Sequence, residues 1–258
     1  MPKFAASVSW LFQDVPLIER FERAARAGFE AVEVQAPYEE PAEALAAELT
    51  RHNLEAVLIN VQPGLAAMPD QEPQFRGAVE RALRYAETMD CRQMHCVAGR
   101  TEGDPRAEAT FLANLRWAAE LAGAQGVKLL LEPLNTTDNP GYFLTGSAQA
   151  RRIIEAVGSE HVAMQFDFYH LQIMEGSLTE ALRKHLDVVA HIQIGGVPGR
   201  REPGEQQEIN YPYLFDLIDS LGFAGWVGCE FAATEGGDGL GWAAPYGLGA
   251  GAHAGGNG

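Results

Sequence analysis

Short apolar runs and longer amphipathic stretches alternate along almost the whole chain. The short runs are rich in branched and aromatic residues, which is typical of buried strands. The longer stretches repeat apolar residues at helical spacing, as in 75–90, where Val79, Leu83 and Ala86 fall near one face. The predicted strands are 4–8, 31–34, 55–60, 93–97, 128–132, 162–167, 188–194 and 226–230. The predicted helices are 16–27, 42–52, 75–90, 107–125, 147–157, 178–186 and 211–221.

Eight strands that alternate with helices indicate repeated βαβ units and a parallel sheet. We therefore predict an α/β fold of the TIM (β/α)8 barrel type. The alternative is a doubly wound open sheet, which usually has fewer strands and binds its ligand at one switch point. No glycine-rich nucleotide-binding pattern follows the first strand, so a simple nucleotide-binding fold is not indicated.

The length and composition fit one large domain. The chain has 258 residues, of which 47% are hydrophobic, enough to bury a full core. We predict a single barrel domain over 1–246. The segment 247–258 is rich in glycine and alanine with little to pack, so we expect it to be a flexible tail.

The formal net charge of −16 excludes some partners. Nucleic acids and anionic membrane surfaces both need a basic footprint, so neither is expected. An anionic substrate must be attracted locally by a metal or an arginine. The three cysteines have no metal-binding spacing, and no signal peptide or membrane-length apolar run is present. We expect buried free thiols and a cytoplasmic protein.

One metal-compatible side chain stands at the end of each of four successive predicted strands. They are Glu132, Asp167, Gln193 and Glu230. In a (β/α)8 barrel the C-terminal strand ends form one mouth, where active sites are built, so these four oxygen-bearing groups are expected to converge. Carboxylate and amide oxygens suit Mg²⁺ or Mn²⁺, whereas zinc is less favoured without histidine or cysteine. For each residue alone, a helix cap or an arginine pair is the alternative.

Two histidines lie near the same mouth. His170 follows Asp167 by three residues, and we expect it on the βα loop, where it could polarise a substrate oxygen. A structural histidine bonded to a loop carbonyl is the alternative. His95 lies near the end of the fourth predicted strand. It is a candidate substrate-binding residue if it points into the mouth, and a core residue if it points into the barrel wall.

Two loops are expected to border the mouth. The loop after Gln193 combines glycines with Arg200 and Arg201, and we select Arg200 as the residue that holds a substrate carboxylate. The longer loop 133–146 follows the fifth strand, and its length favours a cover over the site. An exposed structural loop is the alternative for the second.

Five segments, taken together and in order, resemble the hydroxypyruvate isomerase family. They are Glu132-Pro-Leu-Asn, Gln165-Phe-Asp-Phe-Tyr-His170, His191-Ile-Gln193, the stretch 204–212 and Gly228-Cys-Glu230. This family lies within the xylose-isomerase-like barrels that include ketose 3-epimerases. The resemblance covers nearly the whole chain except the tail. It implies a TIM barrel, and metal ligation by Glu132, Asp167, Gln193 and Glu230.

The resemblance also implies an activity, the reversible conversion of hydroxypyruvate to tartronate semialdehyde by metal-assisted proton transfer through an enediolate. Glu132 and Glu230 would form the acid/base pair, and a small 2-oxo-3-hydroxy acid would be the substrate. One position departs from the family, because Ala232 and Ala233 stand where a lysine or glutamine, often followed by proline, is typical. A four-carbon 2-oxo-tetronate, a ketose for 3-epimerisation, and a non-catalytic sugar-acid-binding barrel are the alternatives. The oligomeric state stays open between a monomer and a homodimer or larger homo-oligomer.

Overall fold

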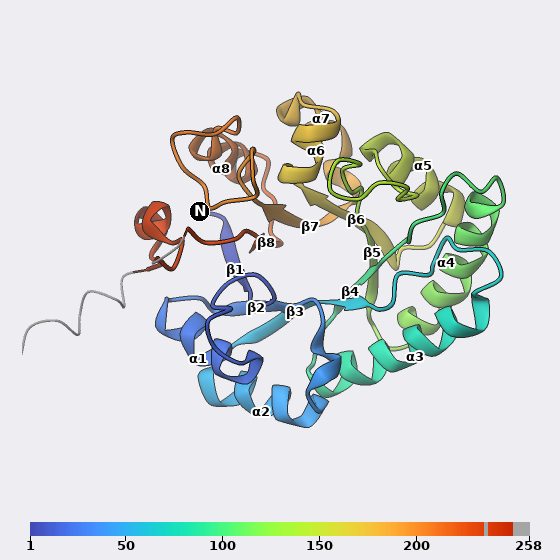
Figure 1. Cartoon of the computed structure of the whole chain (residues 1–258), viewed down its shortest axis with the longest axis horizontal. Helices are drawn as coiled ribbons and strands as arrows, with labels where there is room; N and C mark the ends of the chain where they lie inside the picture. Colours follow the sequence, from blue (N-terminus) through green and yellow to red (C-terminus); the bar gives the residue numbers. More distant parts are fainter. Residues whose placement is uncertain (235–236, 250–258) are drawn as a thin grey trace, which may run out of the picture.

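The computed structural model describes residues 1–234 and 237–249. Within them, eight parallel strands close into one barrel in chain order, and the helices surround it (Figure 1). The strands are β1 (Lys3–Ser7), β2 (Ala31–Val34), β3 (Glu55–Val61), β4 (Gln93–Cys96), β5 (Lys128–Leu131), β6 (Val162–Asp167), β7 (Val189–Ile194) and β8 (Trp226–Cys229). The predicted (β/α)8 barrel is confirmed, with each strand within a residue of its expected bounds.

The helices are α1 (Leu17–Arg26), α2 (Ala42–His52), α3 (Glu72–Thr88), α4 (Ala107–Gly123), α5 (Ser147–Val157), α6 (Phe168–Met174), α7 (Leu178–His185) and α8 (Tyr211–Ser220). Short 3₁₀ turns add η1 (Pro37–Glu39), η2 (Leu186–Val188) and η3 (Gly241–Tyr246). All seven predicted helices are present. Helix α6 was not predicted, because it starts directly after β6 and is too short to show a helical repeat.

Side chains on each strand alternate between the helices and the barrel interior. On β5, for example, Leu129 and Leu131 join the main core against the helices, while Leu130 belongs to a separate small cluster with Leu58 and Ala163. The same alternation turns the residue that follows Leu131, which is Glu132, inward. Strand-end residues of this inward set therefore meet at the C-terminal mouth of the barrel.

The segment after η3 is packed where the structure describes it. Leu248 is buried, and the Gly249 amide donates a hydrogen bond to the Ala27 carbonyl at 2.8 Å. The described chain thus continues three residues past the expected domain boundary at 246. The rest of the expected tail, 250–258, lies outside the described residues.

All three cysteines are buried free thiols. None of the described helices has the length and apolarity needed to cross a bilayer.

Gly228 on β8 makes room for a carboxylate that crosses the barrel interior. A Cβ at this position would lie 1.7 Å from Glu33 Oε1. Because Glu33 is fully buried, its side chain has no open space to move into. We expect Gly228→Ala to lower the free energy of unfolding by about 3 kcal/mol, measured by urea denaturation.

Gly77 provides the matched control for that substitution. It lies on the exposed side of α3, and a Cβ there meets nothing within 4 Å. Gly77→Ala should raise stability by roughly 0.5–1 kcal/mol through helix propensity. A Gly228→Ala protein as stable as the wild type would contradict the packing that the structure describes.

Candidate active site

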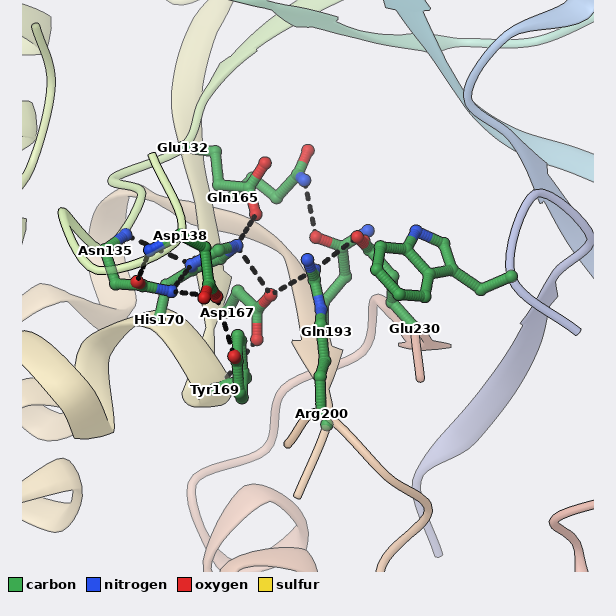
Figure 2. Close-up of polar contacts among 12 residues, drawn as sticks. Glu132, Asn135, Asp138, Gln165, Asp167, Tyr169, His170, Gln193, Arg200 and Glu230 are labelled. Atoms are coloured by element: carbon green, nitrogen blue, oxygen red, sulfur yellow. Dashed lines mark hydrogen bonds and ion pairs between the residues drawn. The ribbon is translucent and has the colours of Figure 1, made fainter. Parts of the chain in front are cut away.

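The strand ends of β5, β6, β7 and β8 bring the four predicted oxygen ligands to one side of the barrel mouth (Figure 2). Glu132 and Glu230 directly follow β5 and β8, Asp167 ends β6, and Gln193 lies on β7 between them, paired in register with Asp167 and Gly228. All four side chains are buried. The convergence expected from the sequence is therefore present in the structure.

Arg200 reaches into this cluster from the loop after β7. Its Nη2 lies 3.2 Å from Asp167 Oδ2 and also donates to Glu230 Oε1. The guanidinium lies between the Trp10 and Tyr169 rings, 4.3 and 5.0 Å from their centroids, which provides cation–π contacts. The Arg200 Nε is buried and has no hydrogen-bond partner among the described residues. Arg201, its neighbour, is exposed and donates to the Ala233 carbonyl.

Burial perturbs the carboxyl groups of this cluster. It raises the pKa of Glu132 well above its usual value, and the charges of Glu230 and Asp167 add to the effect. Burial also raises the pKa of Glu230 to about 8, although Arg200 partly opposes it. The pKa of Asp167 is raised for the same first reason, with Arg200 opposing. Three crowded carboxyl groups out of water cannot all ionise without more positive charge nearby.

The two carboxylate oxygens of Asp167 make different contacts. Its Oδ1 accepts the Tyr169 amide at 2.8 Å and caps the N-terminus of α6. Its Oδ2 faces Arg200 and His170. The helix cap that the sequence left as an alternative thus coexists with a role in the cluster. It also places His170 in the first turn of α6, which corrects the expectation that His170 lies on a loop.

The loop 133–146 determines which ring nitrogen of His170 carries the proton. The Asn135 backbone amide donates to His170 Nδ1 at 3.1 Å, and an N–H group can only donate. Burial, with Arg200 and His95 adding to it, lowers the pKa of His170 well below its usual value, so the ring is neutral. The one ring proton is then on Nε2, which faces Asp167 Oδ2 at 3.6 Å and Glu132 Oε1 at 3.8 Å. His170 Nε2 is a hydrogen-bond donor in this tautomer.

The same loop packs over α6 through Asp138. The carboxylate of Asp138 accepts from the Tyr169 hydroxyl at 2.7 Å and from Asn135 Nδ2 at 2.9 Å. Because Tyr169 also contacts Arg200, the loop supports two site residues, and its role as a cover over the mouth stays a prediction.

His95 lies inside the cluster rather than in the barrel wall. Its Nδ1 is 3.2 Å from Glu132 Oε2, and burial lowers the pKa of His95 to about 3, so the ring is neutral. Neither ring nitrogen makes a hydrogen bond to the described residues. His95 is therefore a neutral ring beside Glu132, and its contact with a substrate stays a prediction.

Glu33 on β2 was not identified from the sequence. Its carboxylate is fully buried and accepts hydrogen bonds from His191 and Gln193 on β7. A charged residue within the apolar run 31–34 was the available signal. Glu33 precedes the end of its strand, so the strand-end pattern that identified the other acids does not include it.

The chemistry of these donors fits a divalent cation. Glu132 Oε1 and Glu230 Oε2 are buried oxygens with no hydrogen-bond partner in the described part of the chain. Glu132, Asp167 and His170 also place one ligand-type atom each within 4.8 Å of one another. His170 Nε2 carries its proton, however, which removes it from the ligand set. Carboxylate and amide oxygens then remain, the donors preferred by Mg²⁺ and Mn²⁺.

A closed (β/α)8 barrel with buried acids, a neutral histidine and an arginine at its C-terminal mouth defines a barrel enzyme of the xylose isomerase type. The family model described as xylose isomerase-like TIM barrel matches residues 21–247. The chain belongs to this family, and its curated relatives make it an isomerase of the hydroxypyruvate and 2-oxo-tetronate isomerase group.

Two of these relatives match over almost their full length. The 2-oxo-tetronate isomerase of Cupriavidus necator is 44% identical, over 95% of this chain and 99% of the relative. The hydroxypyruvate isomerase of Escherichia coli is 39% identical, over 95% of this chain and 100% of the relative. A crystal structure from Brucella melitensis, described as an AP endonuclease of family 2, has a TM-score of 0.93 at 45% identity, with 95% of this chain and 99% of that one covered.

Proposed function

We propose that this protein interconverts hydroxypyruvate and tartronate semialdehyde, a three-carbon 2-oxo-3-hydroxy acid and its aldehyde isomer. The observation that carries the proposal is the pair of buried carboxyl groups, Glu132 and Glu230, both with raised pKa values, at the strand ends where Arg200 pairs with Glu230. The reaction removes a proton from C3, forms an enediolate, returns a proton to C2 and moves the hydroxyl proton from the C3 oxygen to the C2 oxygen. The two steps at carbon need one ionised and one protonated group. Two carboxyl groups whose pKa values burial has raised can supply that combination.

The remaining residues of the cluster have roles that follow from their donors. His170 Nε2–H donates to a substrate oxygen and supports the charge that develops there. Arg200 holds the substrate carboxylate, with its free Nε as an available donor. His95 contacts the substrate from the β4 side. Exclusion of water follows from the burial of all these groups and strengthens each electrostatic contact.

Glu132, Asp167, Gln193 and Glu230 would hold a Mg²⁺ or Mn²⁺ ion. The ion would supply Lewis-acid stabilisation for negative charge on the substrate oxygens. The raised pKa values of the three carboxyl groups support this assignment, because a cation among them offsets their mutual repulsion.

A four-carbon 2-oxo-tetronate is the second candidate substrate. The relative that is 44% identical carries that name. Ala232 and Ala233 stand where the family typically has a lysine or glutamine, often followed by proline. Their small side chains would leave room for a substrate one carbon longer than hydroxypyruvate.

Two other classes of function are less well supported. DNA cleavage, which the name of the Brucella protein suggests, fits poorly with a net charge of −16, and the described residues contain one potential metal group rather than several. A non-catalytic sugar-acid-binding barrel would not need buried carboxyl oxygens without hydrogen-bond partners on Glu132 and Glu230, where the Glu230 charge raises the pKa of Glu132. Ligand binding without turnover would favour it.

The decisive experiment is turnover in deuterium oxide. Purified protein with Mg²⁺ or Mn²⁺ should convert hydroxypyruvate to tartronate semialdehyde that carries solvent deuterium at C2, detected by NMR. EDTA should abolish turnover, and either metal should restore it. A parallel assay with a 2-oxo-tetronate decides between the substrates by the ratio of kcat/KM. Absence of both product and deuterium incorporation with all substrates would refute the proposed function.

A further inference from the structure

A buried carboxylate on the far side of the barrel contacts the candidate metal ligand Gln193. Glu33 lies on β2 and is completely buried. Its Oε2 accepts a hydrogen bond from Gln193 Nε2 at 3.0 Å. Its Oε1 accepts from His191 Nε2 at 2.5 Å. Both partners lie on β7, so one carboxylate links two strands that are not neighbours in the barrel.

The barrel leaves a passage for this contact. Between β2 and β7 stand β1 and β8, and the inward position on β8 is Gly228. A Cβ there would overlap the Glu33 carboxylate, as described above. The absence of a side chain at this position therefore matches the path that Glu33 takes, which indicates a built contact rather than an accidental one.

The contact decides which way the Gln193 amide is turned. Because Gln193 Nε2 donates to Glu33 Oε2, the NH₂ group of Gln193 faces Glu33. The carbonyl oxygen of Gln193 then points away from β2 and toward β6, the strand that ends at Asp167. On that side Gln165 Nε2 donates to Gln193 Oε1 at 2.5 Å. The carbonyl oxygen has a second lone pair, which is free for another partner.

We propose that Glu33 is a positioning residue that holds the Gln193 carbonyl oxygen toward the carboxylate cluster, and so keeps Gln193 an oxygen ligand for the divalent cation. This inference rests on the proposed function in one respect, the role of Gln193 as a ligand. Without Glu33 the amide can rotate by half a turn and present its NH₂ group, which repels a cation. Such outer hydrogen bonds typically change metal affinity by about 10- to 100-fold.

The test measures Mn²⁺ affinity of the metal-free full-length protein by isothermal titration calorimetry. Glu33→Gln should bind Mn²⁺ about 10- to 100-fold more weakly than the wild type. The amide that replaces the carboxylate can donate as well as accept, so it no longer requires the NH₂ group of Gln193 to face it. Glu55→Gln, at an exposed position on β3, is the control and should bind as the wild type does. Thermal unfolding in EDTA reports whether each variant is folded.

An exchange of the two groups separates positioning from a merely structural role. In the double variant Glu33→Gln/Gln193→Glu, the new amide on β2 donates to the new carboxylate on β7 and still accepts from His191. Mn²⁺ affinity should return to the wild-type level or above it, because an oxygen ligand again faces the cluster. This variant also carries the test if Glu33→Gln alone does not fold.

The outcomes are distinct. If the wild-type protein binds no Mn²⁺, Gln193 is not a metal ligand. Both the proposed metal site and the positioning role of Glu33 are then overturned. A wild type that binds Mn²⁺, with folded Glu33→Gln binding equally well, overturns only the positioning role. A folded double variant that binds Mn²⁺ no better than Glu33→Gln alone has the same meaning.

Discussion

Replacing Glu230 or Glu132 with glutamine is expected to lower kcat for the isomerisation by about a thousandfold or more. Each substitution keeps the size of the side chain but removes the group that takes or returns a proton. Burial, with charge repulsion added, raises the pKa of both carboxyl groups, and that of Glu230 to about 8. Steady-state kinetics with hydroxypyruvate measures the loss.

Hydrogen exchange shows which carboxyl group serves which carbon. In deuterium oxide, the variant that has lost the C3 base should leave hydroxypyruvate unlabelled. The variant that has lost the C2 acid should still exchange the C3 hydrogens with solvent while forming no product. Glu43→Gln, at an exposed position on α2, is the control and should keep full activity. Full activity in either active-site variant would exclude that residue from the acid/base pair.

Replacing Arg200 with alanine is the second large expected effect, a fall in kcat/KM for hydroxypyruvate of about 100-fold. The guanidinium is held between Trp10 and Tyr169 and retains a free buried Nε, the geometry of a carboxylate anchor. Most of the loss should appear in KM. Arg200→Lys should recover only part of it, because an ammonium group lacks the planar fork of the guanidinium.

A substrate without a carboxylate isolates this role. Dihydroxyacetone offers the same hydroxy-ketone unit, so its turnover, where measurable, should change far less in Arg200→Ala than that of hydroxypyruvate. Arg201→Ala is the matched control, since Arg201 is exposed and lies one residue away. If Arg201→Ala raises KM and Arg200→Ala does not, the carboxylate anchor has been assigned to the wrong arginine.

The sequence was sufficient to predict the barrel because its periodicities are local. Alternation along β5 and the apolar spacing of α3 are set by residues a few positions apart. The position of Glu132, Asp167, Gln193 and Glu230 at strand ends follows from the same local pattern. Parallel topology then brings strand ends together whatever the side chains are. Helix α6 escaped prediction because it is seven residues long and begins directly after Asp167, its N-cap.

The contacts that define the chemistry were beyond the sequence, since they join residues far apart in the chain. The tautomer of His170 depends on a backbone amide of the loop 133–146, and a backbone group has no signature in the sequence. The pairing of Arg200 with both Asp167 and Glu230 depends on how one loop folds back over the mouth.

By itself, then, the sequence determined the fold and which strand ends carry oxygen-bearing side chains, because strand and helix periods are read within a few residues. Only the tertiary structure decided how those ligands are oriented. Glu33 reaches Gln193 across 160 residues of chain, and its passage depends on a glycine on a third strand. Such a contact exists only once the barrel has closed, because closure is what brings β2 and β7 within reach of one carboxylate.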